Sequence, residues 1–405
     1  MNPANNPIPK ERESSLSTDH GRTSRPRGGA GLPLILLATA ASALAVFAAR
    51  TVRAAADVDP VPELTTAAPA ANPAATLPGV QRLATVPDAA PPLAPAIPPQ
   101  GAASGSVGLA AIQSGLPWRS GASCAEGGFE RWRGRRLDAN TMYLGHASWN
   151  AMVERLRGGY FKGVAHRSPQ PSISVAMFPD NLRHQHAACA RGQFDSYFRQ
   201  FGQLMAQAGA GHAVVRIGWE ANTVDNHAWS IASTGDIPAY VSCFRRLATA
   251  LKQGSPNLKI EWSNAKKGKL KVNVLNTYPG DSYADLWGVH YYDSGADLGS
   301  AKGWAAFLNS TNDGGPQGIG QWLKQARAHG KKLAVPEWGV WDQGGGAKGA
   351  DDPGYIQNMF QFFKANAGDI AYENYYNCPA RHRIFPGSPY PKASAAYRQL
   401  WSSGR

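Results

Sequence analysis

Aromatic side chains are confined to the last three quarters of this 405-residue chain. Of the 39 Phe, Trp and Tyr residues, 38 follow position 105 and only Phe47 precedes it. A folded core requires large apolar side chains, because their burial provides most of the favourable free energy of folding. The first quarter of the chain therefore cannot form a core, which excludes two domains of equal size. We expect one folded unit of roughly 300 residues, at 106–405, behind a non-globular leader.

The leader divides by composition into three segments. Residues 1–31 are polar and basic, and residues 32–56 begin with an uncharged apolar run at 32–49. The length of that run approaches the ~20 residues with which a helix spans a bilayer. A cleaved signal peptide and an uncleaved transmembrane anchor both remain open, because small residues follow the run and a long polar segment precedes it. Either interpretation predicts that the folded unit is exported, and that it is secreted or lies at the periplasmic face of the inner membrane.

The third segment, 57–105, contains 11 Pro and 13 Ala in 49 positions. Proline fixes φ and lacks an amide proton, and alanine offers little apolar surface. The segment is therefore expected to be an extended, semi-stiff linker.

Four cysteines lie in the folded unit, at Cys124, Cys189, Cys243 and Cys378. They are widely spaced and form no CxxC motif, so a zinc knuckle or a thioredoxin-like motif is not indicated. In an exported protein they predict up to two disulfides, with three possible pairings. Free buried thiols are the alternative.

Strand-like and helix-like stretches alternate along the folded unit. Apolar, β-branched or aromatic runs lie at 172–178, 213–219, 259–263, 286–292, 333–337 and 370–376, and helix-period stretches lie at 194–208, 238–253, 317–329 and 355–366. This alternation predicts a parallel sheet of βαβ units, with two further units at 115–146. Eight units in about 300 residues predict an α/β fold of the (β/α)8 TIM barrel type. No GxGxxG or GxxxxGK[ST] motif opens a helix, so we expect no nucleotide and no other cofactor.

Two of the predicted strands end in a glutamate next to a tryptophan, at Glu220 and Glu337. An ionised carboxylate at the end of an apolar strand costs several kcal/mol unless it is paired or solvated. One such residue could form a structural ion pair. Two of them, on strands three apart in order, suggest facing carboxylates in a cleft at the end of the barrel where active sites lie. Cleavage of a glycosidic bond requires such a pair.

Aromatic and amide side chains near the strand ends are candidates for sugar binding, because flat rings stack on sugar faces. The candidates are Trp219, Asn222, Trp262, Asn264, Trp338, Trp341 and Tyr376. For each tryptophan taken singly, a place in the core is an equally good interpretation. For Trp219, Trp338 and Trp341 we favour a place in the cleft, because they lie at or beyond strand ends. His184 and His186 form an HxH pair without an evident third ligand, so we interpret them as surface loop residues and predict no metal site.

These motifs resemble family 26 glycoside hydrolases, the β-mannanase family of the large retaining (β/α)8 clan. The segment 216–222 (RIGWEAN) is similar to the Arg-x-x-His/Trp-Glu-x-Asn segment of that family. The segments 261–264 (EWSN), 278–293 with its YPGD and Tyr-Asp ends, and 333–339 (LAVPEWG) resemble the strands that follow. The resemblance covers roughly 120–400, in the family's order and spacing.

The resemblance implies a role for each matching residue. Glu220 would be the general acid/base and Glu337 the nucleophile of a retaining double displacement. Tyr292 would hydrogen-bond the nucleophile, and Arg216 and Asn222 would line the floor of the site. The two carboxyl groups would lie ~5–5.5 Å apart, and Glu220 would have a raised pKa so that it begins the cycle protonated.

Two positions depart from the family. Classical members have histidine where this chain has Trp219, and aspartate where it has His290. Both positions would border the sugar at the cleavage site, so a specificity for mannan is not implied. His290 could contact the substrate or could be a satisfied histidine at a strand end.

The net charge of +13 is almost entirely carried by the folded unit, whose own balance is +12. A basic balance can indicate nucleic acid or anionic lipid, but no RRM, helix-turn-helix or OB pattern is present, so we expect no nucleic-acid partner. Basic clusters lie at 131–136 and at 266–271, the second just after the 259–263 strand. That cluster could attract an acidic polysaccharide to the cleft, or could be a solvated loop.

Two functions therefore follow from the sequence. The first is an exported retaining β-glycosidase or endo-glycanase that acts on an exopolysaccharide or an envelope glycan, tethered to the membrane through 32–49 if that segment is not cleaved. The second is a non-catalytic carbohydrate-binding barrel in a polysaccharide export or assembly system.

Overall fold

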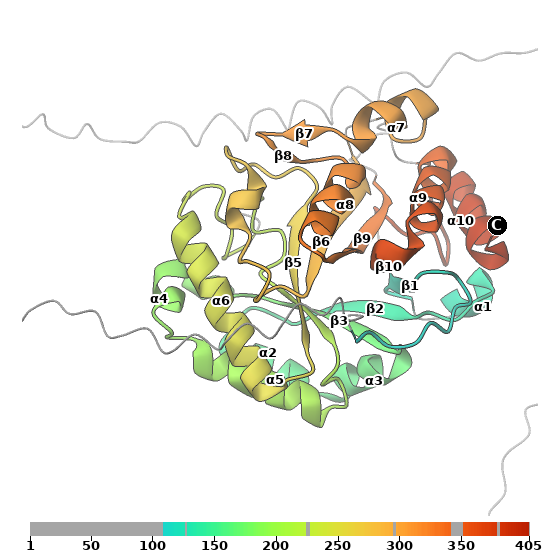
Figure 1. Ribbon diagram of the computed structural model, residues 1–405. Helices are drawn as coiled ribbons and strands as arrows, with labels where there is room; N and C mark the ends of the chain where they lie inside the picture. Colours follow the sequence, from blue (N-terminus) through green and yellow to red (C-terminus); the bar gives the residue numbers. More distant parts are fainter. Residues whose placement is uncertain are drawn as a thin grey trace, which may run out of the picture. The chain divides into compact units, whose positions relative to one another are not determined.

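A closed barrel of eight parallel strands forms the centre of the protein (Figure 1). The computed structural model describes residues 108–125, 128–223, 227–294, 297–341, 351–378 and 381–404. Around the barrel the strand order is β1-β10-β9-β6-β5-β4-β3-β2. The strands are β1 (Ser120–Ser123), β2 (Ala139–Tyr143), β3 (Gln170–Val175), β4 (Val214–Ile217), β5 (Lys259–Ala265), β6 (Leu286–Asp293), β9 (Lys332–Val340) and β10 (Ile370–Tyr376). The predicted (β/α)8 barrel is confirmed.

Helices surround the barrel on its outside (Figure 1). They are α1 (Phe129–Arg133), α2 (Trp149–Arg157), α3 (Gly159–Arg167), α4 (His186–Ala190), α5 (Asp195–Gln207), α6 (Ile237–Gly254), α7 (Ala301–Leu308), α8 (Ile319–Ala328), α9 (Pro353–Ala365) and α10 (Pro391–Ser403). Short 3-10 helices lie at Asp180–Leu182, Val274–Thr277 and Ala367–Asp369, and a two-stranded hairpin joins β7 (Thr311–Asn312) to β8 (Gly315–Pro316).

Helix α6 illustrates why these segments become helices that cover the barrel. The side chain of Asp236 accepts a hydrogen bond from the backbone N–H of Ala239, which caps the N-terminus, and a proline lies in the first turn. Its buried side chains include Tyr240, Phe244 and Leu251, which recur at helical spacing on one face. The helix therefore buries an apolar stripe and exposes the rest.

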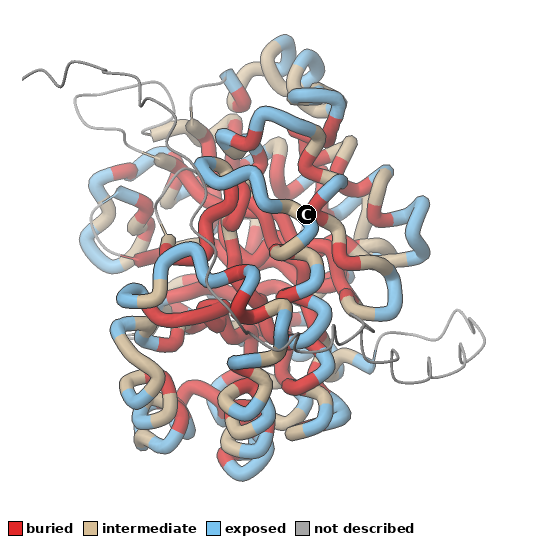
Figure 2. The backbone as a smooth tube through the Cα atoms, turned by 90° about the vertical axis from the view of Figure 1, so that its left-hand side faces the viewer, coloured by how far each residue is buried: buried red, intermediate tan, exposed pale blue. Residues whose placement is uncertain are grey.

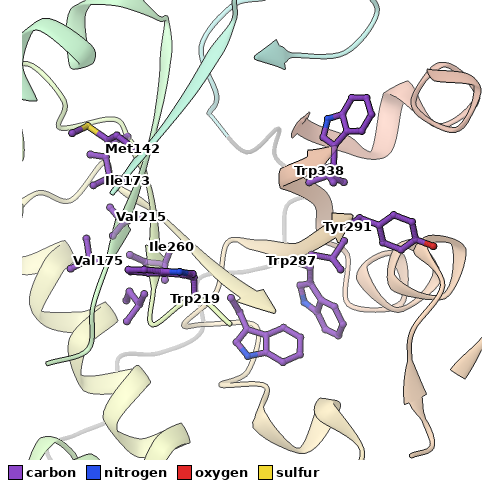
Figure 3. Packing of buried hydrophobic residues seen from close by; sticks show 14 of the residues in the cluster. Met142, Ile173, Val175, Val215, Trp219, Ile260, Trp287, Tyr291 and Trp338 are labelled. Carbon is purple, nitrogen blue, oxygen red and sulfur yellow. The ribbon is translucent and has the colours of Figure 1, made fainter. Parts of the chain in front are cut away.

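Most apolar side chains lie in one large cluster between the strands and the helices, and Figure 3 shows several of its members, among them Ile173, Val215 and Trp287. Figure 2 shows the corresponding buried interior and exposed periphery. A smaller cluster comprises Ala139, Val214, Leu286, Ala334, Ala371 and Tyr372, near the starts of their strands. The inner face of the barrel is thus apolar at its amino-terminal end, while polar side chains occupy the other end.

Two disulfides connect the four cysteines of the folded unit. Cys124 after β1 is bonded to Cys378 after β10, and Cys189 of α4 is bonded to Cys243 of α6. These bonds select one of the three pairings that the sequence left open. Among the helices of the described residues, none is both long and apolar enough to cross a membrane. The predicted segments 1–31, 32–56 and 57–105 lie outside the described residues.

Candidate active site

Polar side chains from four strands meet at the carboxyl end of the barrel. Arg216 comes from β4, Ser263 from β5, His290 from β6 and Glu337 from β9. All four are buried. Alternate residues of a strand face the same side, so inward positions near the strand ends bring these groups together.

Glu337 is held by two hydrogen bonds, one on each carboxylate oxygen. Arg216 Nη1 donates to Oε1 at 2.8 Å, and the hydroxyl of Tyr292 donates to Oε2 at 2.9 Å. Burial by itself would raise the pKa of Glu337, but the neighbouring His290 and the charged guanidinium of Arg216 outweigh burial and lower it. Glu337 is therefore an oriented carboxylate, as a nucleophile must be.

Glu220 lies three residues beyond the end of β4 on a strained backbone turn. Its φ is +53°, in the left-handed region that a non-glycine residue seldom adopts, and its N–H donates to Ser263 O at 3.1 Å. Gly218 in the same turn also has a positive φ. Strain of this kind is retained where the surrounding structure enforces it, often at functional sites.

The ring of His290 lies between the two candidate catalytic carboxylates. Nδ1 lies 2.8 Å from Glu220 Oε1, and Nε2 lies 3.2 Å from Glu337 Oε1. Nε2 also lies 2.7 Å from Arg216 Nη1. A guanidinium can only donate, so Nε2 must accept and the ring proton lies on Nδ1, where it is donated to Glu220. A neutral His290 thus orients Glu220.

The pKa of Glu220 differs from our expectation. Burial by itself would raise it, but His290 and His227 outweigh burial and hold the pKa of Glu220 well below its usual range. His227 Nε2 lies 3.9 Å from Glu220 Oε2. The expected raised pKa is therefore wrong, because the sequence did not reveal that two imidazoles stabilise the carboxylate.

Two cavities open beside these carboxylates. One, of about 820 Å³, is lined by Trp219 and Tyr143 together with the loop after β2 and part of α2. The other, of about 520 Å³, is lined by Glu220, His290, Tyr292, Trp341 and the loop after β5. Both volumes lie within the range of ligand-binding pockets, ~300–1,000 Å³.

Two candidate substrate-binding rings line these cavities, Trp219 the first and Trp341 the second. Trp219 is 5% exposed and packs edge-on against Tyr143, with ring centroids 5.5 Å apart. Trp341 and Tyr376 each pack edge-on against Tyr292, at 5.0 Å and 5.9 Å. The structure therefore brings these rings to the same end of the barrel as Glu220 and Glu337.

Four candidates are placed elsewhere, which corrects the sequence interpretation. On β5, Glu261 and Ser263 contact inner-face residues, so the alternating Trp262 and Asn264 lie on the outer face. Trp262 packs against Trp287 at 4.9 Å. Neither Trp262 nor Asn264 lines the two cavities.

Trp338 also belongs to the core. It is fully buried, stacks on Trp401 of α10 at 5.3 Å, and donates from its indole to Glu373 Oε2 at 2.6 Å. Asn222 is buried as well, and its side-chain amide bonds to the backbone N–H and C=O of Ala265 instead of facing a substrate. Its position is structural.

His186 also differs from expectation, and the 131–136 cluster contributes bonds that hold the fold. His186 is buried on α4, where Nε2 lies 3.1 Å from Trp229 O and burial lowers its pKa to about 4, whereas His184 is exposed. Arg133 and Arg135 bond to Ser120 Oγ and to backbone carbonyls. These groups stabilise the fold away from the cleft.

The sequence interpretation did not identify Tyr143, Ser174 or His227 as site residues. Ser174 accepts a hydrogen bond from Arg216 Nη2, and Tyr143 lies under that guanidinium, with its ring centroid 5.3 Å from Cζ. Both could have been found as inward residues at strand ends. His227 lies in no strand or helix and carried no such signal.

No protein-family model and no curated protein sequence matches the chain. Solved structures do match. A double mutant of the Cellulomonas fimi endo-β-1,4-mannanase is 17% identical, with a TM-score of 0.50 and coverage of 69% of this chain and 70% of that chain. A modular endo-β-1,4-mannanase from Cellulomonas fimi, of glycoside hydrolase family 26, is 18% identical, with a TM-score of 0.52 and coverage of 71% and 74%. The chain therefore shares the barrel fold of family 26 mannanases.

Proposed function

We propose that this protein is a retaining β-glycosidase that cleaves an extracellular or envelope polysaccharide, of a β-mannan-like or exopolysaccharide type. The observation that carries the proposal is the pair formed by Glu220 and Glu337, which one histidine ring joins at the mouth of the barrel. The fold shared with endo-β-1,4-mannanases supports it.

In the proposed first step, Glu337 Oε attacks the anomeric carbon while Glu220 donates a proton to the leaving glycosidic oxygen. A covalent glycosyl ester forms on Glu337 and the aglycone departs. In the second step, Glu220 removes a proton from water, which attacks the anomeric carbon and releases Glu337. Arg216 and Tyr292 keep the free carboxylate of Glu337 ionised and oriented for the attack.

The low pKa of Glu220 suits the second step, in which it acts as a base, and restricts the first, in which it must be protonated. The proposed enzyme is therefore most active at acidic pH. A bound substrate changes this balance when the leaving oxygen replaces part of the contact with His290.

The hydrogen bond from His290 to Glu220 also favours a second candidate function, a non-catalytic carbohydrate-binding barrel. A carboxylate that His290 keeps ionised donates no proton, yet can still accept hydrogen bonds from sugar hydroxyls. In that case the protein would bind its glycan without cleaving it.

Hydrolysis of a panel of exopolysaccharides and envelope glycans, neutral and acidic, separates the two candidates. Glu337→Gln should abolish cleavage by the full chain and preserve glycan binding, because it removes the nucleophile and retains the shape of the side chain. Asp313→Asn is the matched control, since this exposed carboxylate lies in the β7–β8 turn. Binding without cleavage by the unmutated chain would support the second candidate.

We also propose that the protein acts outside the cytoplasm. The two disulfides fit an oxidising compartment. Residues 32–49 would direct export or anchor the chain, and 57–105 would separate the membrane from the domain at 106–405. Cell fractionation tests this, and recovery of the protein in the cytoplasm with reduced cysteines would contradict it.

A further inference from the structure

Three lysines of one loop line the cavity beside Glu220. Lys266, Lys267 and Lys269 follow β5, and together with Glu220 they are the charged residues that line this 520 Å³ cavity in the described part of the chain. The remaining lining includes Tyr292, Trp341, Phe307 and Gln317. Glu220 therefore faces a mostly basic wall.

The lysine loop is held in a fixed position by the turn that carries Glu220. Asn222 bonds to both backbone groups of Ala265, and its own C=O accepts from the N–H of Lys269 at 2.8 Å. A Cβ at Gly268 would lie 2.2 Å from Asn222 O, so the two backbones meet where only glycine fits. The lysines thus keep a defined place relative to Glu220.

The three lysines differ in how their charges are balanced. Lys266 is 8% exposed, donates to the carbonyls of Tyr292 and Ser294, and has Asp293 as an opposing charge. Lys267 and Lys269 are exposed, and within the described ranges no carboxylate forms an ion pair with either. Two ammonium groups at the cavity are therefore available to a ligand.

We propose that this cavity is a subsite for a negatively charged sugar, in which Lys267 and Lys269 bind the carboxylate of a uronic acid unit of the polysaccharide. The inference rests on the function proposed above, because it assigns a charge to the substrate of the same cleft. Lys266 holds the loop behind them through its bonds to the carbonyls of Tyr292 and Ser294, and Tyr292 and Trp341 provide the aromatic surface for the ring.

Binding of matched neutral and acidic oligosaccharides tests the subsite. The full chain carrying Glu337→Gln is titrated by calorimetry with two pairs of β-1,4-linked oligomers of equal length: mannose with mannuronate, and glucose with glucuronate. In each pair the glycans differ only in the C6 group. We expect the acidic member of at least one pair to bind about tenfold more tightly at low salt, a preference that 0.15 M salt should reduce because exposed charges are screened over ~8 Å.

Variants of the loop show whether the lysines cause the preference. Lys267→Ala together with Lys269→Ala should remove it and leave the affinity for the neutral oligomer unchanged. Lys271→Ala is the matched control, since it removes the same charge from the same exposed loop but does not line the cavity. The proposal would be overturned if Lys271→Ala reduced the preference for the acidic oligomer equally. It would also be overturned if the unmutated loop showed no such preference in either pair, or bound none of the oligomers.

Hydrolysis by the unmutated chain, measured on the same oligomers, keeps this proposal separate from the proposed enzyme. Equal cleavage and equal binding of neutral and acidic glycans would refute the anionic subsite and support the glycosidase. Tight, lysine-dependent binding of an acidic glycan without cleavage of any glycan would support the subsite and refute the glycosidase.

Discussion

His290 is the residue in which this site departs most from the family that the sequence resembles. It donates from Nδ1 to Glu220 and accepts at Nε2 from Arg216, so it couples the two candidate catalytic carboxylates. A hydrogen bond to a charged group contributes about 1.5–3 kcal/mol, and one pKa unit corresponds to about 1.4 kcal/mol. His290 is thus able to shift the titration of Glu220 by about one to two pH units.

We therefore expect His290→Asn to move the pH profile of the reaction. His290 and His227 lower the pKa of Glu220, so removing the larger contribution raises that pKa and leaves Glu220 protonated at higher pH. The alkaline limb of kcat/KM should shift upward by about one unit or more. His227→Asn should shift it in the same direction by less. A limb that stays in place in both variants would contradict the role of the imidazoles.

Tyr292 and its neighbour Tyr291 form a natural comparison on β6. Tyr292→Phe removes the hydrogen bond to Glu337 Oε2, so kcat should fall by about 10- to 100-fold, the equivalent of about 1.5–3 kcal/mol. The hydroxyl of Tyr291 instead accepts from the N–H of Ile319 on α8. Tyr291→Phe should lower thermal stability and leave kcat nearly unchanged, and similar kcat values in the two variants would count against the proposed orientation of the nucleophile.

At the scale of elements, the disulfide from Cys124 to Cys378 spans the point where the barrel closes. It joins the ends of β1 and β10, the first and last strands of the barrel along the chain, which pair in register from Ser120 to Ser123. The second disulfide, Cys189 to Cys243, joins helices outside the barrel and encloses a shorter segment, with a sequence separation of 54 against 254.

Replacing Cys124 and Cys378 by serine should lower the free energy of unfolding by about 2–5 kcal/mol, because the unfolded chain regains the freedom of a long loop. Replacing Cys189 and Cys243 should cost somewhat less, because the loop is shorter. Urea denaturation of the two double variants measures both values. A greater loss for the Cys189–Cys243 pair would show that local strain or packing outweighs loop length.

The six predicted strands and four predicted helices overlap with observed elements because their apolar residues recur with clear periods. Helices α3 and α10 were not predicted, since glycine, alanine and serine weaken that signal. Trp262 and Trp338 were assigned to the wrong face of their strands. Adjacent strand residues point to opposite faces, so an error of one position in the alternation exchanges the core for the cleft. Glu220 and Glu337 could be chosen as candidates because an ionised group at the end of an apolar strand requires a special environment.

At the scale of the whole molecule, the barrel explains how a domain with an apolar core carries a polar site. Small apolar side chains fill its amino-terminal end, and charged side chains meet at the other, where loops from β4, β5 and β6 form the cavity beside Glu220. The fold is shared with family 26 mannanases, and Trp219 and His290 are the positions at which the sequence departs from the family pattern that it resembles.

The stereochemistry of the first product tests the central claim most directly. Proton NMR of the reaction, recorded before mutarotation, should show the β-anomer as the first sugar released from a β-linked glycan that the protein cleaves, and Glu337→Gln should release none. A first product of the α-anomer would show inversion and contradict the assignment of Glu337 as nucleophile, and cleavage that persists in Glu337→Gln would contradict it as well.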